Sequence, residues 1–245
     1  MPRPSTYAPE SPDYLIINES QTSNDIGIWV DTPPMPPMAE QVYREINIPD
    51  REESLTVADE TYKDIPLAVK AYTFDNAYDM TTVYSWLRGA KKLRFKDDDY
   101  YYRVKQVKPP TLNYSGHGKT MITLNFVVSP FRYVKVDTTV ISTQTTFTVQ
   151  NIGNVYCRPQ YKIFGSGTIT LKVDDDNNKI KITGVDGYVI VDAERMLIYK
   201  DSSTFLSGEG VIPFLDVGSS EVTVVPQSSG DTFTKVEITR NQRVV

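Results

Sequence analysis

The feature that most constrains the fold is a two-residue alternation of apolar and polar side chains. It is clearest in the second half of the chain, where Ile169, Leu171 and Val173 alternate with polar residues. Ile180 and Ile182 resume the pattern after a short segment of Asp and Asn. Because successive side chains of a strand point to opposite faces, this spacing predicts two strands that each bury one face. The chain is therefore predicted to be mainly β.

Further short runs rich in Thr, Val, Ile and Tyr lie between clusters of Asp, Asn, Gly and Pro. From residue 131 onward the turn signals recur at the spacing of about 8–12 residues that is typical of β-sandwiches. The segment YVIVDAERMLIYK repeats the alternation, with DAER as a tight connection. In the first half, strands are predicted near 14–17, 43–48, 65–74, 91–95, 100–107 and 120–128.

One helix is predicted, from Asp79 to about Arg88. Asp79 is a suitable N-cap, and Gly89 is a suitable end signal. The apolar residues fall at the i, i+3 and i+4 spacing of a helix that packs one stripe against a sheet. The stripe consists of Val83, Trp86 and Leu87.

Proline marks the organisation of the chain. Residues 1–40 are rich in proline and predict an irregular arm. Pro130, in SPFRY (129–133), lacks the N–H that a strand ladder requires, so it indicates a domain boundary. Two domains are expected, at residues 1–130 and 131–245.

Composition excludes several classes of protein. The formal charge of −5 gives the chain as a whole no basic character of the kind that binds duplex nucleic acid. Cys157 is the single cysteine, which excludes an intrachain disulfide and a Cys-based zinc site. No segment reads as a signal peptide or is apolar enough to span a membrane, so synthesis in a reducing cytoplasm is expected. No cofactor is predicted.

Two Asp triplets, at 97–99 and 174–176, raise the question of a metal site. The second resembles the start of an EF-hand loop, but Lys179 stands where the loop needs Gly and Val185 where it needs Glu. Adjacent carboxylates in a strand point to opposite faces and cannot share one ion. Both triplets are therefore interpreted as hairpin turns, in which Asp and Asn bond nearby amides.

Nucleophilic catalysis has little support. His117 is the only histidine and lies between glycines in a predicted loop, and Cys157 lies in a predicted strand. A Ser or Cys triad would need this histidine as its base, and no G-x-S-x-G motif is present. The segment GHGKT lacks both the upstream Gly and the following helix of a phosphate-binding loop. No catalytic residue is predicted.

The segment 88–108 combines basic side chains with three consecutive tyrosines. Such a combination binds single-stranded nucleic acid in some proteins. An exposed hairpin that contacts a protein partner explains it equally well, and we favour this second interpretation.

The order of these signals resembles the distal tail protein (Dit) family of long-tailed phages that infect Gram-positive bacteria. The resemblance runs over nearly the whole chain and includes an N-x-G-N motif that begins at Asn151. The segments that carry it are YREINIPDREESLTVADETYKDIPLAVKAYTF, VYSWLRGAKKLRFKDDDYYYRVKQV, GKTMITLNFVVSPFRY, TVQNIGNVYCRPQYKIFGSGTITLKV, YVIVDAERMLIYK and GVIPFLDVGSSEVTV.

The resemblance implies a β-sandwich-like N-terminal domain with one helix, which forms a ring, usually a hexamer, and a galectin-like C-terminal β-sandwich. It implies a non-enzymatic structural hub at the distal end of the virion tail. The ring would connect the tail tube, made of the major tail protein, to the tail-associated fibre or lysin protein. It would also anchor receptor-binding or baseplate proteins, with DNA passing through the ring and no membrane contact.

On this hypothesis the basic, Tyr-bearing segment supplies a subunit or tube contact. The alternative is a carbohydrate-binding protein that uses its C-terminal sandwich on the host wall. The predicted contact residues are Lys91, Lys92, Arg94, Tyr100, Tyr102 and Arg103.

Overall fold

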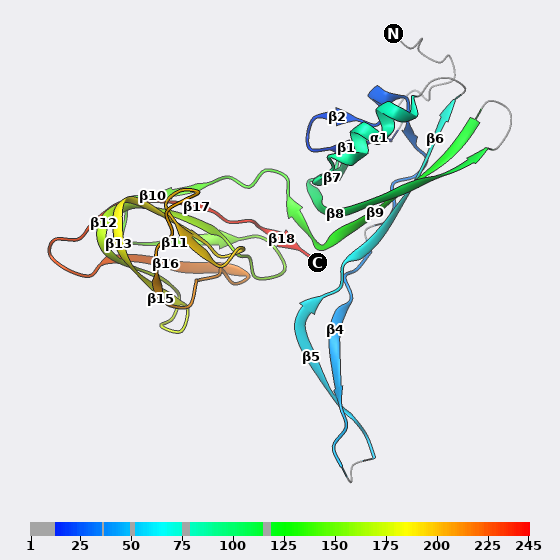
Figure 1. The fold of residues 1–245 in the computed structure, drawn as a ribbon. Coiled ribbons are helices and arrows are strands. Elements are labelled where there is room, and N and C mark those ends of the chain that lie inside the picture. The colour runs from blue at the N-terminus through cyan, green and yellow to red at the C-terminus, as the bar shows by residue number, and fades with distance from the viewer. Residues whose placement is uncertain (1–12, 36, 50–51, 75–78, 115–118) are drawn as a thin grey trace. The chain divides into compact units, whose positions relative to one another are not determined.

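The computed structural model describes residues 13–35, 37–49, 52–74, 79–114 and 119–245. The chain divides into two compact units, which we describe separately. The first unit runs to Tyr133 and includes Val245, and the second runs from Val134 to Val244. Strands dominate both units (Figure 1), so the prediction of a mainly β protein is confirmed. No helix in the described ranges is long and apolar enough to cross a membrane.

The sheet of the first unit contains seven of its strands, in the order β2-β1-β7-β8-β9-β6-β3. Strand β6 pairs antiparallel with β9 from Ile65↔Val128 to Phe74↔Lys119. Alternate residues of these strands are buried and form the first core. The strands are β1 (Leu15–Ile17), β2 (Gln21–Thr22), β3 (Trp29–Val30), β6 (Ile65–Phe74), β7 (Lys92–Phe95), β8 (Tyr100–Tyr114) and β9 (Lys119–Val134).

The helix α1 (Met80–Arg88) forms as predicted. The Asp79 carboxylate accepts the N–H of Thr81 at 3.0 Å and caps the first turn. This bond lowers the pKa of the Asp79 carboxyl below its usual value. Gly89 is the C-cap with a φ of −97°, so the helix ends without a left-handed residue. The stripe of Val83, Trp86 and Leu87 is buried.

Residues 13–30 depart from the predicted irregular arm. The predicted strand near 14–17 is present as β1, and a short 3-10 helix, η1 (Asn24–Ile26), follows β2. Leu15 and Ile28 are fully buried in the first core. The arm prediction is therefore wrong for this segment, because its apolar residues pack against the sheet although proline-rich sequence surrounds them. Residues 1–12 lie outside the described residues.

Pro130 does not end its strand, contrary to the expectation from its missing N–H. Strand β9 continues to Val134, four residues beyond the proline. The pairing of β9 with β6 ends at Val128, so Pro130 lies beyond that ladder and removes no hydrogen bond from it.

The second unit is built around the β12–β13 hairpin. Its predicted alternation is confirmed, since Ile169, Leu171, Val173, Ile180 and Ile182 are all buried in the second core. The first part of β12 pairs with β17 and the last part with β16. The strands are β10 (Val140–Ser142), β11 (Thr146–Asn151), β12 (Gln160–Val173), β13 (Lys179–Asp192), β14 (Leu197–Tyr199), β15 (Gly208–Gly210), β16 (Gly218–Pro226), β17 (Thr232–Thr239) and β18 (Arg243–Val244).

Two local features shape this hairpin. The register of β12 against β13 shifts between Gly167 and Ile169, where Gly167 has a φ of 88°. A Cβ at this glycine would overlap the carboxylate of Asp231, so a side chain is excluded on two grounds. The predicted DAER connection is confirmed, and the Asp192 carboxylate accepts the N–H of Arg195 at 3.0 Å.

Candidate assembly surface

The first Asp triplet forms the turn between β7 and β8. The Asp98 carboxylate accepts the N–H of Tyr100 at 3.0 Å and lies 3.8 Å from the guanidinium of Arg132. Asp97 has a φ of 57°, a left-handed conformation that Asp tolerates in turns. The Asp98 carboxylate thus stabilises the turn and pairs with one arginine, and the prediction of a hairpin turn is confirmed here.

The second triplet is also a turn, between β12 and β13. The Asp175 carboxylate accepts the N–H groups of Asn177 and Asn178 at 2.8 and 3.1 Å. The Asp174 carboxylate accepts the N–H of Glu221 at 2.6 Å. Neighbouring carboxylates therefore bind separate backbone groups. Among the residues that the structure describes, no three His, Cys, Asp or Glu side chains gather to hold a metal ion.

Cys157 is fully buried, and its backbone pairs with Leu215. Burial raises the pKa of the Cys157 thiol to about 12, so the thiol stays neutral near pH 7. A thiolate nucleophile is not available at this position. The loop that contains His117 lies outside the described residues.

One face of β7, β8 and β9 carries interleaved cations and rings. The Lys92 ammonium lies 4.6 Å from the ring centroid of Tyr101, and the Arg103 guanidinium lies 3.7 Å from that of Tyr133. The two tyrosine rings stack with centroids 5.6 Å apart. Lys92 and Arg103 are paired positions of neighbouring strands. The face defined by Lys92, Tyr101, Arg103 and Tyr133, hereafter the cation–ring face, is thus an ordered, positively charged surface.

Two of the predicted contact residues are covered by the chain itself. The Tyr102 side chain is 2% exposed and packs in the first core, and its burial raises the pKa of its phenol. Arg94 is 9% exposed and lies 3.4 Å from the Glu19 carboxylate. Both side chains stabilise the strands from within.

The remaining predicted contact residues are more accessible. The side chains of Lys91 and Lys92 are exposed, and their backbone N–H groups donate to the Asn18 side chain at 2.8 and 3.0 Å. Tyr100 is half-buried, with the Arg132 guanidinium 5.1 Å from its ring centroid. The structure therefore gathers Lys91, Lys92 and Arg103 near one end of β7 and β8.

Sequence reasoning missed Tyr101 and Tyr133. The signal that finds Tyr101 is the two-residue period of the strand, which places it on the same face as Arg103 and opposite to Tyr102. Tyr133 had no such signal, because its contact with Tyr101 depends on β9 lying next to β8.

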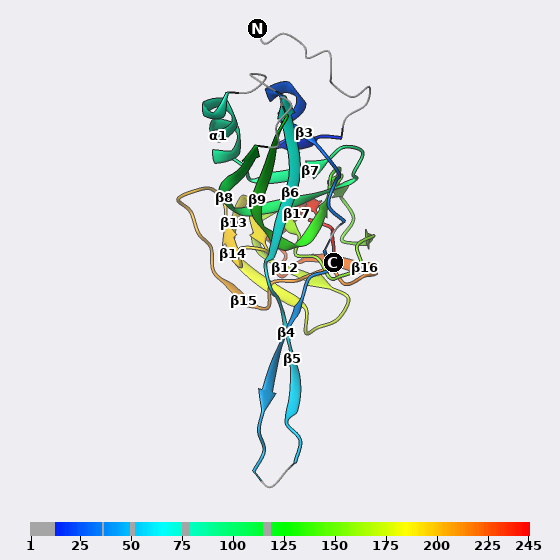
Figure 2. The same cartoon turned by 90° about the vertical axis from the view of Figure 1, so that its right-hand side faces the viewer.

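A second surface feature is the β4–β5 hairpin. Strands β4 (Gln41–Ile46) and β5 (Leu55–Tyr62) pair only with each other (Figure 1 and Figure 2). The hairpin was not predicted as a separate sheet. Several of its apolar side chains are exposed, with Tyr43 at 59% and Leu55 and Val57 each at 43%.

Isolated two-stranded hairpins are marginally stable in water. Pairs such as Arg44–Asp59 at 3.1 Å and Lys63–Glu40 at 2.6 Å add little, because the charged groups are exposed. An exposed strand pair with apolar side chains is a surface that a further chain would stabilise.

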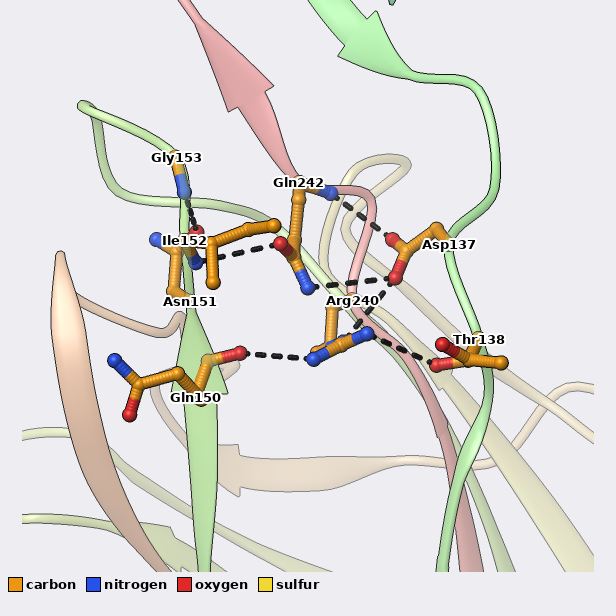
Figure 3. A network of polar contacts seen from close by, with 8 residues as sticks. All are labelled: Asp137, Thr138, Gln150, Asn151, Ile152, Gly153, Arg240 and Gln242. Atoms are coloured by element: carbon orange, nitrogen blue, oxygen red, sulfur yellow. Dashed lines mark hydrogen bonds and ion pairs between the residues drawn. The ribbon is translucent and has the colours of Figure 1, made fainter. Parts of the chain in front are cut away.

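The N-x-G-N motif forms part of a polar network in the second unit (Figure 3). The side-chain carbonyl oxygen of Asn151 accepts the N–H of Gly153 at 3.0 Å. The next residue, Ile152, donates its N–H to the Gln242 side chain at 3.3 Å. A Cβ at Gly153 would overlap the backbone of Arg243, so glycine is required. The motif therefore has a structural role.

The centre of this network is the Asp137–Arg240 ion pair. Its Nε–Oδ1 distance is 3.1 Å, and both side chains are mostly buried. The guanidinium also donates to the carbonyl oxygens of Gln150 and Thr138 at 3.0 and 3.2 Å (Figure 3). The Asp137 carboxylate accepts the N–H of Gln242 at 3.0 Å. The network joins the start and the end of the second unit.

No protein-family model matches the chain, and no curated protein matches it. Among solved structures, the chain is similar to SPP1 Dit (gp 19.1), which is described as a paradigm of the hub adsorption apparatus in phages that infect Gram-positive bacteria. The similarity has a TM-score of 0.67 and 15% identity, and it covers 93% of this chain and 98% of SPP1 Dit. The chain therefore has the fold of a Dit protein, which confirms the resemblance drawn from the sequence at the level of the fold.

Proposed function

We propose that this protein is a non-enzymatic structural hub at the distal end of a phage tail. The observation that carries the proposal is the similarity to SPP1 Dit, which includes both units and nearly all of both chains. A match over two units is more informative than a match to one common β-sandwich, because single sandwiches serve many functions.

The hub would act by assembly. Copies of the chain close into a ring through head-to-tail interfaces. About six subunits is the number that the resemblance implies. The ring joins the tail tube, built from the major tail protein, to the tail-associated fibre or lysin protein. Its outer surface anchors receptor-binding or baseplate proteins. No cofactor takes part.

Two surfaces of the first unit support assembly. The β4–β5 hairpin exposes apolar side chains that no other strand of the described chain covers by pairing. The cation–ring face, together with the exposed Lys91, offers ordered positive charge for an acidic neighbour. Arg94 and Tyr102 contribute indirectly, by holding the strands in place.

The first test measures the mass of the purified chain by light scattering and images it by negative stain. The expected result is a ring of about six subunits. A chain that remains monomeric both alone and with the tail-tube protein would contradict the proposal.

The second test asks which surface makes the contact. The double charge reversal Lys91→Glu and Lys92→Glu should reduce ring formation, and Lys135→Glu is the matched control because Lys135 is an exposed lysine of the second unit. Normal assembly of the double variant would exclude these lysines.

The contact made by the β4–β5 hairpin is tested by a double variant, Ile46→Ser with Leu55→Ser. Ile46 and Leu55 are cross-strand partners. This double variant should weaken the ring and leave the fold of the monomer unchanged. Ile141→Ser is the control, because Ile141 is an exposed apolar residue at 62%. Equal assembly of the two proteins would show that the hairpin does not form the interface.

A further inference from the structure

A groove of about 690 Å³ lies on the second unit, across β16, β12, β13 and β15. Its lining residues on β12, such as Thr170 and Lys172, alternate with the buried Ile169, Leu171 and Val173. The groove therefore occupies the outer face of the strands whose inner face forms the second core. None of its lining residues belongs to the first unit.

The floor of the groove contains two lysines that face each other across neighbouring strands. Lys172 of β12 and Lys179 of β13 are paired positions. Like charges at such positions destabilise a sheet. Asp176, from the turn between the strands, lies 3.7 Å from the Lys172 ammonium and 3.5 Å from that of Lys179. One carboxylate thus serves two cations, and it is itself 75% exposed.

Lys181 extends the positive charge along the groove. It lies on β13 opposite Thr170 of β12 and opposite Glu209 of β15. The described residues include no carboxylate within ion-pair distance of the Lys181 ammonium. Three ammonium groups therefore share one face, and among the described residues Asp176 is the one carboxylate that forms an ion pair with any of them.

The rest of the lining is suited to hydroxyl groups. The side chains of Thr170, Thr223, Asn177 and Gln227 provide donors and acceptors, and Glu209 adds a strong acceptor. Val211 and Val225 supply apolar contact, and no aromatic side chain lines the groove. Recognition here would rest on charge and hydrogen bonds, without ring stacking.

We propose that this groove binds a segment of an anionic polyhydroxylated chain, meaning a glycan or polyol whose units carry phosphate or carboxylate groups. The anionic groups would lie against Lys172, Lys179 and Lys181, and the hydroxyl groups against the Thr, Asn, Gln and Glu209 side chains. This inference does not depend on ring formation, since the groove is contained within one unit of one chain.

The test titrates the full chain by calorimetry with four polymers. A glycerol-phosphate polymer and polygalacturonate carry the two kinds of anion on a hydroxylated chain. Dextran is hydroxylated but neutral, and poly-glutamate is anionic without hydroxyl groups. Saturable binding of the first or second polymer, weakened by added salt, is expected. The polymer that binds more tightly identifies phosphate or carboxylate as the anion.

The proposal predicts opposite changes in binding affinity for two substitutions in the groove. Lys181→Glu should weaken binding about tenfold, because it replaces a charged donor with a repelling carboxylate. Asp176→Asn should tighten binding several-fold, because it releases Lys172 and Lys179 from their shared counter-ion. Lys135→Glu is the matched control and should change binding little, since Lys135 is exposed and lies outside the groove.

Thermal unfolding by circular dichroism checks that each variant is folded. If Lys181→Glu does not fold, the increase with Asp176→Asn still decides the question. The proposal is overturned if neither anionic polyol binds, if dextran or poly-glutamate binds as tightly as the anionic polyols, or if both groove variants behave like Lys135→Glu.

Discussion

The β4–β5 and β12–β13 hairpins are both antiparallel and rich in β-branched and aromatic residues, but they differ in what covers them. In β12–β13, every second residue over much of its length is buried in the second core. In β4–β5, Leu55 and Val57 are each 43% exposed, and no third strand pairs with them in the described chain. Two strands can pair through their own backbones, whereas burial of their apolar side chains requires a further layer of protein. One hairpin finds its partner within the chain, and we propose that the other finds it in a neighbouring copy.

The largest expected effect is truncation inside the covered hairpin. Leu171→Ala should lower the free energy of unfolding by about 4 kcal/mol, because it leaves a cavity in a close-packed core. Since Trp29 and Trp86 both lie in the first unit, urea unfolding should be followed by far-UV circular dichroism. A loss below about 1 kcal/mol would show that the second core is loosely packed.

The next effect concerns the ion pair that joins the start and the end of the second unit. Arg240→Ala should cost about 3 kcal/mol, because it leaves the mostly buried Asp137 carboxylate without its cation. Arg44→Ala is the control, because the two side chains of the Arg44–Asp59 pair are 69% and 41% exposed. The control should change stability by less than about 0.5 kcal/mol in the same urea experiment. Equal losses in the free energy of unfolding of Arg240→Ala and of the control would show that the Asp137 carboxylate does not need Arg240 as its partner.

A smaller effect on stability is expected at the N-cap of α1, where the exposed Asp79 carboxylate accepts the N–H of Thr81. The Thr81 N–H lowers the pKa of the Asp79 carboxyl below 3.8. A carboxyl with a lowered folded pKa stabilises the protein above its unfolded pKa and loses this contribution as the pH falls through the folded pKa. Asp79→Ala should therefore be destabilising at pH 7 and nearly neutral at strongly acidic pH. Unfolding measured at both pH values checks this, and a difference independent of pH would contradict it.

The smallest effect on the monomer is expected in the uncovered hairpin. Leu55→Ala makes the same chemical change as Leu171→Ala, yet it should change the free energy of unfolding of the dilute chain by less than about 0.5 kcal/mol. In the assembled protein the same substitution should weaken subunit association, measured as the concentration at which the ring dissociates. A large loss in the monomer would mean that the chain itself covers Leu55.

Sequence reasoning succeeded where the deciding contacts lie a few residues apart. The limits of α1 follow from Asp79 and from the apolar stripe, and β6 begins and ends at the predicted residues. One carboxylate of each Asp triplet, Asp98 and Asp175, accepts amides two or three residues away. These interactions are local, so one segment at a time is sufficient to predict them.

Sequence reasoning failed where a distant segment decides the outcome. Leu15 and Ile28 are buried although they lie in a proline-rich region, because the sheet of the first unit provides their partners. Pro130 lies in β9 beyond the last residue that pairs with β6, so it removes no hydrogen bond from that ladder. The contact residues were chosen on both faces of β8, and the structure shows that Tyr102 faces the core while Tyr101 stacks on Tyr133.

Near neighbours along the chain were sufficient to predict α1, β6, the β12–β13 hairpin with its turn, and the resemblance to the Dit family, because alternation, capping and Asx turns act over a few residues. Only the tertiary structure decided which strands lie side by side. It placed Lys181 opposite Glu209 and left Leu55 without a third strand in the described chain, since both outcomes depend on the pairing of distant segments. Surfaces of this kind arise from packing, and they are the surfaces that a partner would contact.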